Sequence, residues 1–218
     1  MSSPDWLIEC DTGIFERIKS DESFHQILAL ARAINGLQFA MFVMVTDPQD
    51  FSPAARRSRI NSFLFGSAIL YEGLLLVEKM NKNFGRNNVF KQGLHTLLRD
   101  PSARTLRRSH MGPARNFAVF HYEPDQFGRI VNSASVYECE FMTGRGSSSP
   151  ASYFPFADTL AAEVLMGEAS AGEDFYKRLG LVMSETRDLS LRFIQFSERL
   201  ISKCLHDWGF IHKASARP

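Results

Sequence analysis

The sequence is short of cysteine and of net charge, and both shortages exclude classes of protein. Its three cysteines, Cys10, Cys139 and Cys204, are far apart and odd in number. They form no CxxC pair and no evident disulfide framework, which predicts a reducing, cytoplasmic location. Lysine and arginine (25) nearly balance aspartate and glutamate (24), so the net charge is +1. Any nucleic-acid surface must therefore be a local patch, because the whole chain has no field that attracts an anion.

The sequence also predicts neither a signal peptide nor a membrane-spanning helix. The first residues, MSSPDWLIECDTG, are acidic and lack a basic start followed by an apolar core. The apolar run at 37–45 is too short to cross ~30 Å of hydrocarbon, and the run at 63–77 is broken by Glu72. We therefore expect these runs to be buried helices of a soluble bundle, with no membrane partner.

Patterns for metal, cofactor and nucleophile chemistry are weak. Glu22 and His25 form one Glu-x-x-His pair, whereas a di-iron bundle needs two. Cys204, His206 and His212 lack the second cysteine pair of a structural zinc site. The GRGSSS segment at 144–149 has no lysine of a phosphate-binding loop, and no serine or cysteine nucleophile motif occurs. We predict no metal and no cofactor.

What the sequence has in abundance is apolar residues at helical spacing. Hydrophobic residues make up 44% of the chain and include 19 Phe, enough for a large core. The periodicity predicts an all-α fold, a bundle of four to five main helices in a single domain over 1–218. The expected helices cover 23–46, 54–82, 89–99, 101–111, 113–122, 156–166 and 171–208.

One segment departs from this helical pattern. Residues 135–141 alternate in polarity and contain Val, Tyr and Phe, as a strand does. A Gly- and Ser-rich stretch follows at 142–152, and 153–156 is suited to a return strand. The chain is therefore expected to carry at most one small β-hairpin or flexible loop, inserted at about 135–156.

The stretch GPARNFAVFHYEP, residues 112–124, combines an arginine, an amide and an imidazole with an apolar helix. We expect Gly112-Pro113 to interrupt the preceding helix and Pro113 to start a new one. Arg115 then lies in a first turn, where free N–H groups and the helix dipole favour an anion. Its guanidinium matches phosphate oxygens, Asn116 adds a hydrogen bond, and His121 can exchange a proton near neutral pH.

Arg115-Asn116-x4-His121 resembles the R-x4–6-H signature of the HEPN superfamily, in which the residue after the arginine is typically Asn, Asp or His. The resemblance implies a helical bundle that is often a homodimer and cleaves RNA without a metal ion. It implies Arg115 and His121 as the catalytic pair and Asn116 as their polar helper. It also implies a setting among toxin–antitoxin or anti-phage systems, with an antitoxin or other protein as partner.

The same residues have a purely structural interpretation. Ala114, Phe117, Ala118 and His121 follow the spacing of one buried helix face, so His121 is equally suited to the core. Arg104 and His110 repeat the spacing of Arg115 and His121 nearby, which shows how easily the pair arises.

Two further features bear on the motif. Arg104, Arg107 and Arg108 share one helical face and are candidates to bind an RNA backbone, although such a face is often merely solvated. Glu72 lies in the most apolar helix, where a carboxylate costs free energy unless it is paired. It is the candidate acid to orient Arg115 or His121.

Two hypotheses follow from the sequence. The first is a metal-independent endoribonuclease of the HEPN type, in which Arg115 holds the scissile phosphate and His121 transfers protons. The second is a non-catalytic helical module that dimerises or binds a nucleotide or a partner protein.

Overall fold

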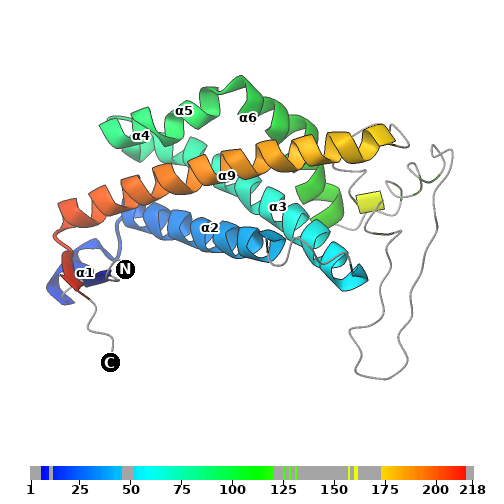
Figure 1. Cartoon of the computed structure of the whole chain (residues 1–218). Helices are drawn as coiled ribbons and strands as arrows, with labels where there is room; N and C mark the ends of the chain where they lie inside the picture. Colours follow the sequence, from blue (N-terminus) through cyan, green and yellow to red (C-terminus); the bar gives the residue numbers. More distant parts are fainter. Residues whose placement is uncertain are drawn as a thin grey trace.

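Three long helices dominate the described part of the chain. The computed structural model describes residues 6–9, 12–45, 52–119 and 173–214, with a few positions between 125 and 161. The long helices are α2 (Glu22–Val45), α3 (Pro53–Phe84) and α9 (Glu173–Trp208). Figure 1 shows α9 lying across α2 and α3, with a row of shorter helices above it. The all-α prediction is confirmed, and the expected helices at 23–46, 54–82 and 171–208 match these three closely.

Local sequence signals explain where α3 begins and which side of α9 is buried. The Ser52 hydroxyl accepts a hydrogen bond from the N–H of Ala55 at 3.2 Å, and Pro53 takes the first helical position. On α9 the buried residues, with Ser197 between the apolar ones, recur every three or four positions, as one face of a helix requires. They include Leu189, Phe193, Leu200 and Cys204.

The row of shorter helices crosses α3 and α9. It comprises α4 (Asn88–Gln92), α5 (Leu94–Arg99), α6 (Pro101–Leu106) and two π-helical segments, η1 (Arg107–Met111) and η2 (Ala114–Val119). The single helix expected over 89–99 is in fact two, divided at Gly93. A Cβ on Gly93 would lie 3.0 Å from the Val89 carbonyl oxygen and 3.1 Å from Phe196. The missing side chain therefore permits both the bend and the close approach of α9.

The predicted interruption at Gly112-Pro113 is wrong. Both residues are helical, so the backbone continues from η1 into η2 without a new helix start. The N–H of Gly112 donates to the carbonyl of Arg107, five residues back. This wider register offers a reason that proline is tolerated, because a proline ring clashes with the carbonyl four residues earlier in an ordinary α-helix. Arg115 therefore does not lie at a helix N-terminus.

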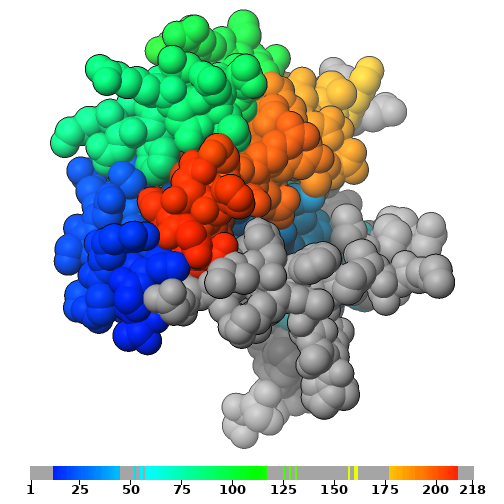
Figure 2. Space-filling model, turned by 90° about the vertical axis from the view of Figure 1, so that its left-hand side faces the viewer, coloured from blue at the N-terminus to red at the C-terminus, as the bar shows by residue number. Residues whose placement is uncertain are grey.

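A small sheet joins the two ends of the chain, which the sequence did not lead us to expect. Strand β1 (Trp6–Glu9) pairs antiparallel with β2 (Ile211–Ala214), and Trp6 is opposite Ala214. The short helix α1 (Thr12–Ile18) follows β1. Figure 2 shows the end of α9 against α1 and the start of α2, where the rings of Phe24 and Trp208 meet edge to face at 5.5 Å. The hairpin predicted at about 135–156 lies outside the described residues.

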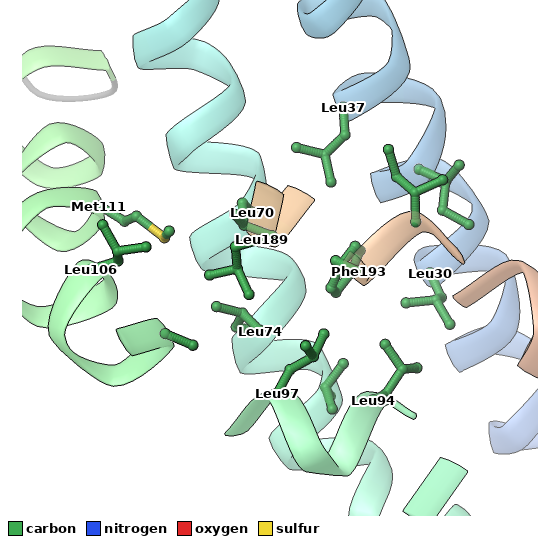
Figure 3. Close-up of a cluster of buried hydrophobic side chains, with 14 of the residues drawn as sticks. Leu30, Leu37, Leu70, Leu74, Leu94, Leu97, Leu106, Met111, Leu189 and Phe193 are labelled. Carbon is green, nitrogen blue, oxygen red and sulfur yellow. The ribbon is translucent and has the colours of Figure 1, made fainter. Parts of the chain in front are cut away.

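The core lies where α2, α3, α9 and the shorter helices converge. Leu30 and Leu37 come from α2, Leu70 and Leu74 from α3, and Phe193 from α9, and each is almost fully buried. Figure 3 shows these side chains pointing toward one another, with Leu94, Leu97, Leu106 and Met111 of the shorter helices completing the cluster. Burial of such side chains contributes roughly 1.5–3 kcal/mol each, so this cluster fixes the relative positions of the helices.

Two helices are longer than the apolar runs that we considered from the sequence. Windows in α2 (Glu22–Met44) and α3 (Arg57–Phe84) both have a mean hydropathy of 1.6, and both helices are long enough to cross a membrane. Of these windows, 33% and 50% respectively are buried inside the chain. The length argument made for residues 37–45 therefore does not hold for the helix that contains them. The cytoplasmic, membrane-free location stays a prediction.

The contact between α3 and α9 leads to a stability prediction. A Cβ on Gly73 would lie 2.7 Å from the fully buried ring of Phe193, so Gly73→Ala overpacks the core and is expected to cost ~1–3 kcal/mol. Gly180, in α9, has nothing within 4 Å of an added Cβ, so Gly180→Ala is the matched control and should stabilise by ~0.5–1 kcal/mol. Urea unfolding followed by circular dichroism measures both. Equal effects of the two variants would contradict this packing.

Candidate functional site

Three arginines of the short helices share one pocket with α3. The pocket has a volume of about 610 Å³ and lies between α3 and the continuous segment α6–η1–η2. We call it the arginine pocket. Its lining residues are Tyr71, Glu78, Leu98, Arg104, Arg107, Arg108, Gly112, Pro113 and Asn116. The structure thus brings together the three arginines that were predicted to share a face, and adds Asn116 of the motif.

Arg107 is the most tightly held of the three arginines. Its guanidinium donates two hydrogen bonds to the Glu78 carboxylate, at 2.5 and 3.1 Å, and lies 5.7 Å from the centre of the Tyr71 ring. The hydrogen bond to Glu78 raises the pKa of Arg107 above its usual value. Because Glu78 balances its charge, Arg107 shapes the pocket wall more than it offers a free charge to a ligand.

Arg104 and Arg108 keep their charges available. The Nε of Arg104 donates to the Leu98 carbonyl at 2.9 Å, which orients the side chain but leaves its charge unbalanced. Arg108 is exposed and makes no hydrogen bond or ion pair within the described part of the chain. The pocket therefore presents three guanidinium groups against the single carboxylate of Glu78. That excess suits an anion with more than one negative charge, such as neighbouring phosphates of a nucleic acid.

The backbone that carries these residues is π-helical over two successive segments, η1 and η2. π-Turns are rare and are frequent at functional sites, because they re-aim side chains relative to an α-helix. Here the turn places Asn116 in the arginine pocket. Its neighbour Arg115 reaches α3 at Glu72.

Glu72 and Asn116 both accept hydrogen bonds from Arg115. Its Nε donates to Glu72 Oε1 at 2.8 Å, and its Nη1 donates to Asn116 Oδ1 at 2.9 Å. The Arg115 and Glu72 side chains are 34% and 47% exposed, so the pair is accessible to a ligand. The sequence nominated Glu72 as an orienting acid, and the structure places it on Arg115. Asn116 contacts both Arg115 and the arginine pocket, and so connects the two.

His121 lies outside the described residues. Of the proposed catalytic group, the structure therefore brings together Arg115, Asn116 and Glu72. Because the helix continues through Pro113, Arg115 has no free helix N-terminus beside it, and that argument for anion binding no longer applies. The case for an anion near Arg115 now depends on the charge of the adjoining pocket.

Sequence reasoning missed Tyr71 and Glu78, which form the α3 wall of the arginine pocket. A signal was present, because residues seven apart share a helix face and α3 carries an acid and an aromatic at that spacing. What the spacing does not reveal is which arginine meets which acid. That choice depends on how η1 packs on α3.

Asp100, which directly precedes α6, anchors the arginine-bearing segment. Its Oδ1 accepts from the N–H of Ser102 at 2.9 Å and so caps α6. Its Oδ2 accepts from Nη1 of Arg192 on α9 at 2.7 Å. The hydrogen bond from Arg192 holds the pKa of Asp100 below its usual value. One carboxylate thus ties the start of α6 to α9.

The cysteine–histidine group considered from the sequence comprises Cys204, His206 and His212, at the end of α9 and in β2. Cys204 is buried, and burial, with the nearby Asp207 carboxylate, raises its pKa to about 11. His206 is next to Asp207 at 3.7 Å. Within the described ranges no three His, Cys, Asp or Glu side chains gather closely enough to hold a metal ion.

Comparison of this chain with models of protein families, with curated proteins and with solved structures finds no match. The resemblance to the HEPN superfamily therefore stands on residues 112–124 alone. Function is inferred from the chemistry of the site, since a helical bundle by itself implies none.

The two roles of Asp100 lead to a separable prediction. Asp100→Asn keeps an oxygen that caps α6 but loses the charge that attracts Arg192, whereas Asp100→Ala loses both. We expect Ala to cost ~1–2 kcal/mol and Asn distinctly less. Because the pKa is lower in the folded protein, the advantage of wild type over Asn should be present above pH ~4 and vanish as pH falls through that lowered pKa. Urea unfolding between pH 2 and 7 measures this, and a pH-independent difference would contradict it.

Proposed function

We propose that this protein is a metal-independent endoribonuclease of the HEPN type. The observation that carries the proposal is the excess positive charge of the arginine pocket directly beside the Arg115–Asn116 pair. A pocket of about 610 Å³ with Arg104 and Arg108 at its wall suits nucleotide-sized groups and their phosphates. RNA is the nucleic acid that supplies its own nucleophile, the 2′-hydroxyl, and so needs the fewest groups from the protein.

The residues have distinct roles in this proposal. Arg104 and Arg108 hold phosphates that flank the cleaved bond, and Arg115 donates to the scissile phosphate as its charge builds in the transition state. Asn116 keeps Arg115 in place. The 2′-oxygen attacks phosphorus, the bond from phosphorus to the 5′-oxygen breaks, and His121 transfers a proton as general base or acid. The products are a 2′,3′-cyclic phosphate and a 5′-hydroxyl.

Further parts of the proposal come from the family resemblance. Two copies of the chain would face each other in a homodimer, so that the two motifs border one cleft. The protein would act in the cytoplasm as a toxin or an anti-phage factor, and an antitoxin or other protein would restrain it.

A second candidate function is a non-catalytic module that binds a nucleotide or a partner protein. The observation that favours it is the ion pair between Arg115 and Glu72, because a carboxylate already engages the Nε donor of the arginine that would hold a phosphate. In this case the arginine pocket binds an anion and no bond is broken.

Cleavage in the absence of metal distinguishes the two candidates. Single-stranded RNA incubated with the full chain in EDTA should be cut, leave 2′,3′-cyclic phosphate ends, and leave matched DNA intact. His121→Ala and Arg115→Ala should each lower the rate at least ~100-fold, as expected for a general acid–base group and a transition-state donor. Arg187→Ala is the control, because Arg187 lies on α9 and is 52% exposed. Full activity of His121→Ala would refute the catalytic assignment.

Binding of RNA should depend on the arginine pocket even in an inactive variant. In a His121→Ala background, Arg104→Ala and Arg108→Ala should each weaken binding of single-stranded RNA. Each should also reduce the slope of log K against log salt by about 0.7, the value for one lost phosphate contact. Fluorescence anisotropy across a salt series measures both quantities. If the slopes of these variants equal that of Arg187→Ala, RNA does not contact the arginine pocket and this part of the proposal is refuted.

A further inference from the structure

A second hollow, which we call the α2–α3 groove, lies on the side of α3 that carries Glu72. Its volume is about 480 Å³. Ala29 and Ala33 of α2 and Ile69 and Leu76 of α3 supply apolar walls. Figure 1 shows α2 and α3, the two helices that line the groove, crossing below α9 in this view. The groove is therefore an apolar surface between two rigid helices.

Large apolar side chains extend this surface along α2. Leu28 is 51% exposed and Phe39 is 62% exposed, and Phe65 of α3 borders the groove. The exposed residues Leu28, Arg32, Asn35 and Phe39 follow one another at spacings of four, three and four residues, which keeps them on one side of α2. That spacing is the seam by which one helix packs along another. Large exposed apolar side chains beside an apolar groove are typical of a contact site.

The rim of the α2–α3 groove carries an unbalanced positive charge. Arg32 and Lys79 both line it, and neither makes a hydrogen bond or ion pair within the described part of the chain. The acid on the rim, Glu72, is engaged by Arg115 at 2.8 Å. A negatively charged occupant would supply the missing counter-charges and would be oriented by them.

We propose that the α2–α3 groove binds an amphipathic helix of another protein, with an apolar stripe and acidic residues on its flanks. The small residues Ala29 and Ala33 allow the helix to approach closely, and its acids would meet Arg32 and Lys79. A second copy of this chain fits less well, because pairing this face with itself brings cations of the two rims toward each other. Binding of the helix is independent of RNA cleavage, so the two proposals fail separately.

Synthetic helices test the charge and shape of the groove directly. One labelled peptide has Leu at alternating spacings of three and four residues, with Glu at the positions beside this apolar stripe. The second peptide has the same sequence with Lys in place of Glu. We expect the full chain to bind the Glu peptide at least ~10-fold more tightly by fluorescence anisotropy. Phe39→Asp should lower that affinity at least ~10-fold, and the double variant Arg32→Glu, Lys79→Glu should reverse the preference toward the Lys peptide.

Leu181→Asp is the matched control, because Leu181 is 59% exposed but lies on α9. It should leave peptide binding unchanged. Equal binding of the two peptides, or a preference that the charge-reversed variant retains, overturns the proposal. So does a Phe39-dependent dimer in sedimentation velocity, which would assign the face to a second copy. Phe39-dependent binding to anionic lipid vesicles without peptide binding would assign it to a membrane.

Discussion

Helix α3 is the element on which the rest of the structure depends, because α2, α9 and the shorter helices all pack against it. Leu70 and Leu74 point into the core that α2, α9 and the shorter helices share. Tyr71 and Glu78 lie on an adjacent face of α3 and form a wall of the arginine pocket. Glu72 lies on a third face of α3 and lines the α2–α3 groove. Since the buried face fixes the rotation of α3, it also fixes which surface each polar residue serves.

The two carboxylates of α3 act by positioning and add little stability. Glu72 and Glu78 meet Arg115 and Arg107 at the surface, with Glu side chains that are 47% and 46% exposed. Exposed pairs of this kind contribute about 0–1 kcal/mol, against roughly 1.5–3 kcal/mol for each large apolar side chain of the core. The core therefore holds the η1–η2 segment on α3. The ion pairs decide where its arginines point.

Much of this arrangement was predictable from the sequence, and the misses have physical causes. The 3.6-residue period located α2, α3 and α9, and placed Arg104, Arg107 and Arg108 on one face. A paired role for Glu72 followed from the cost of a lone carboxylate in an apolar helix. The break at Gly93 and the continuity through Pro113 depend on α9 packing and on a π-register, which single residues do not reveal. The β1–β2 pairing joins residues some 200 positions apart, and local sequence propensity cannot predict a pairing over that distance.

The ion pair of Arg115 with Glu72 does not by itself decide against a catalytic role. The exposed pair contributes at most about 1 kcal/mol, so a second anion needs little interaction energy to compete with Glu72 for Arg115. In the proposed function, a phosphate held by Arg104 and Arg108 would compete for Arg115 in this way. Until then Glu72 would hold Arg115 in one conformation, which would lower the entropy lost on binding. The same carboxylate that balances Arg115 in the free protein would thus prepare it for the ligand.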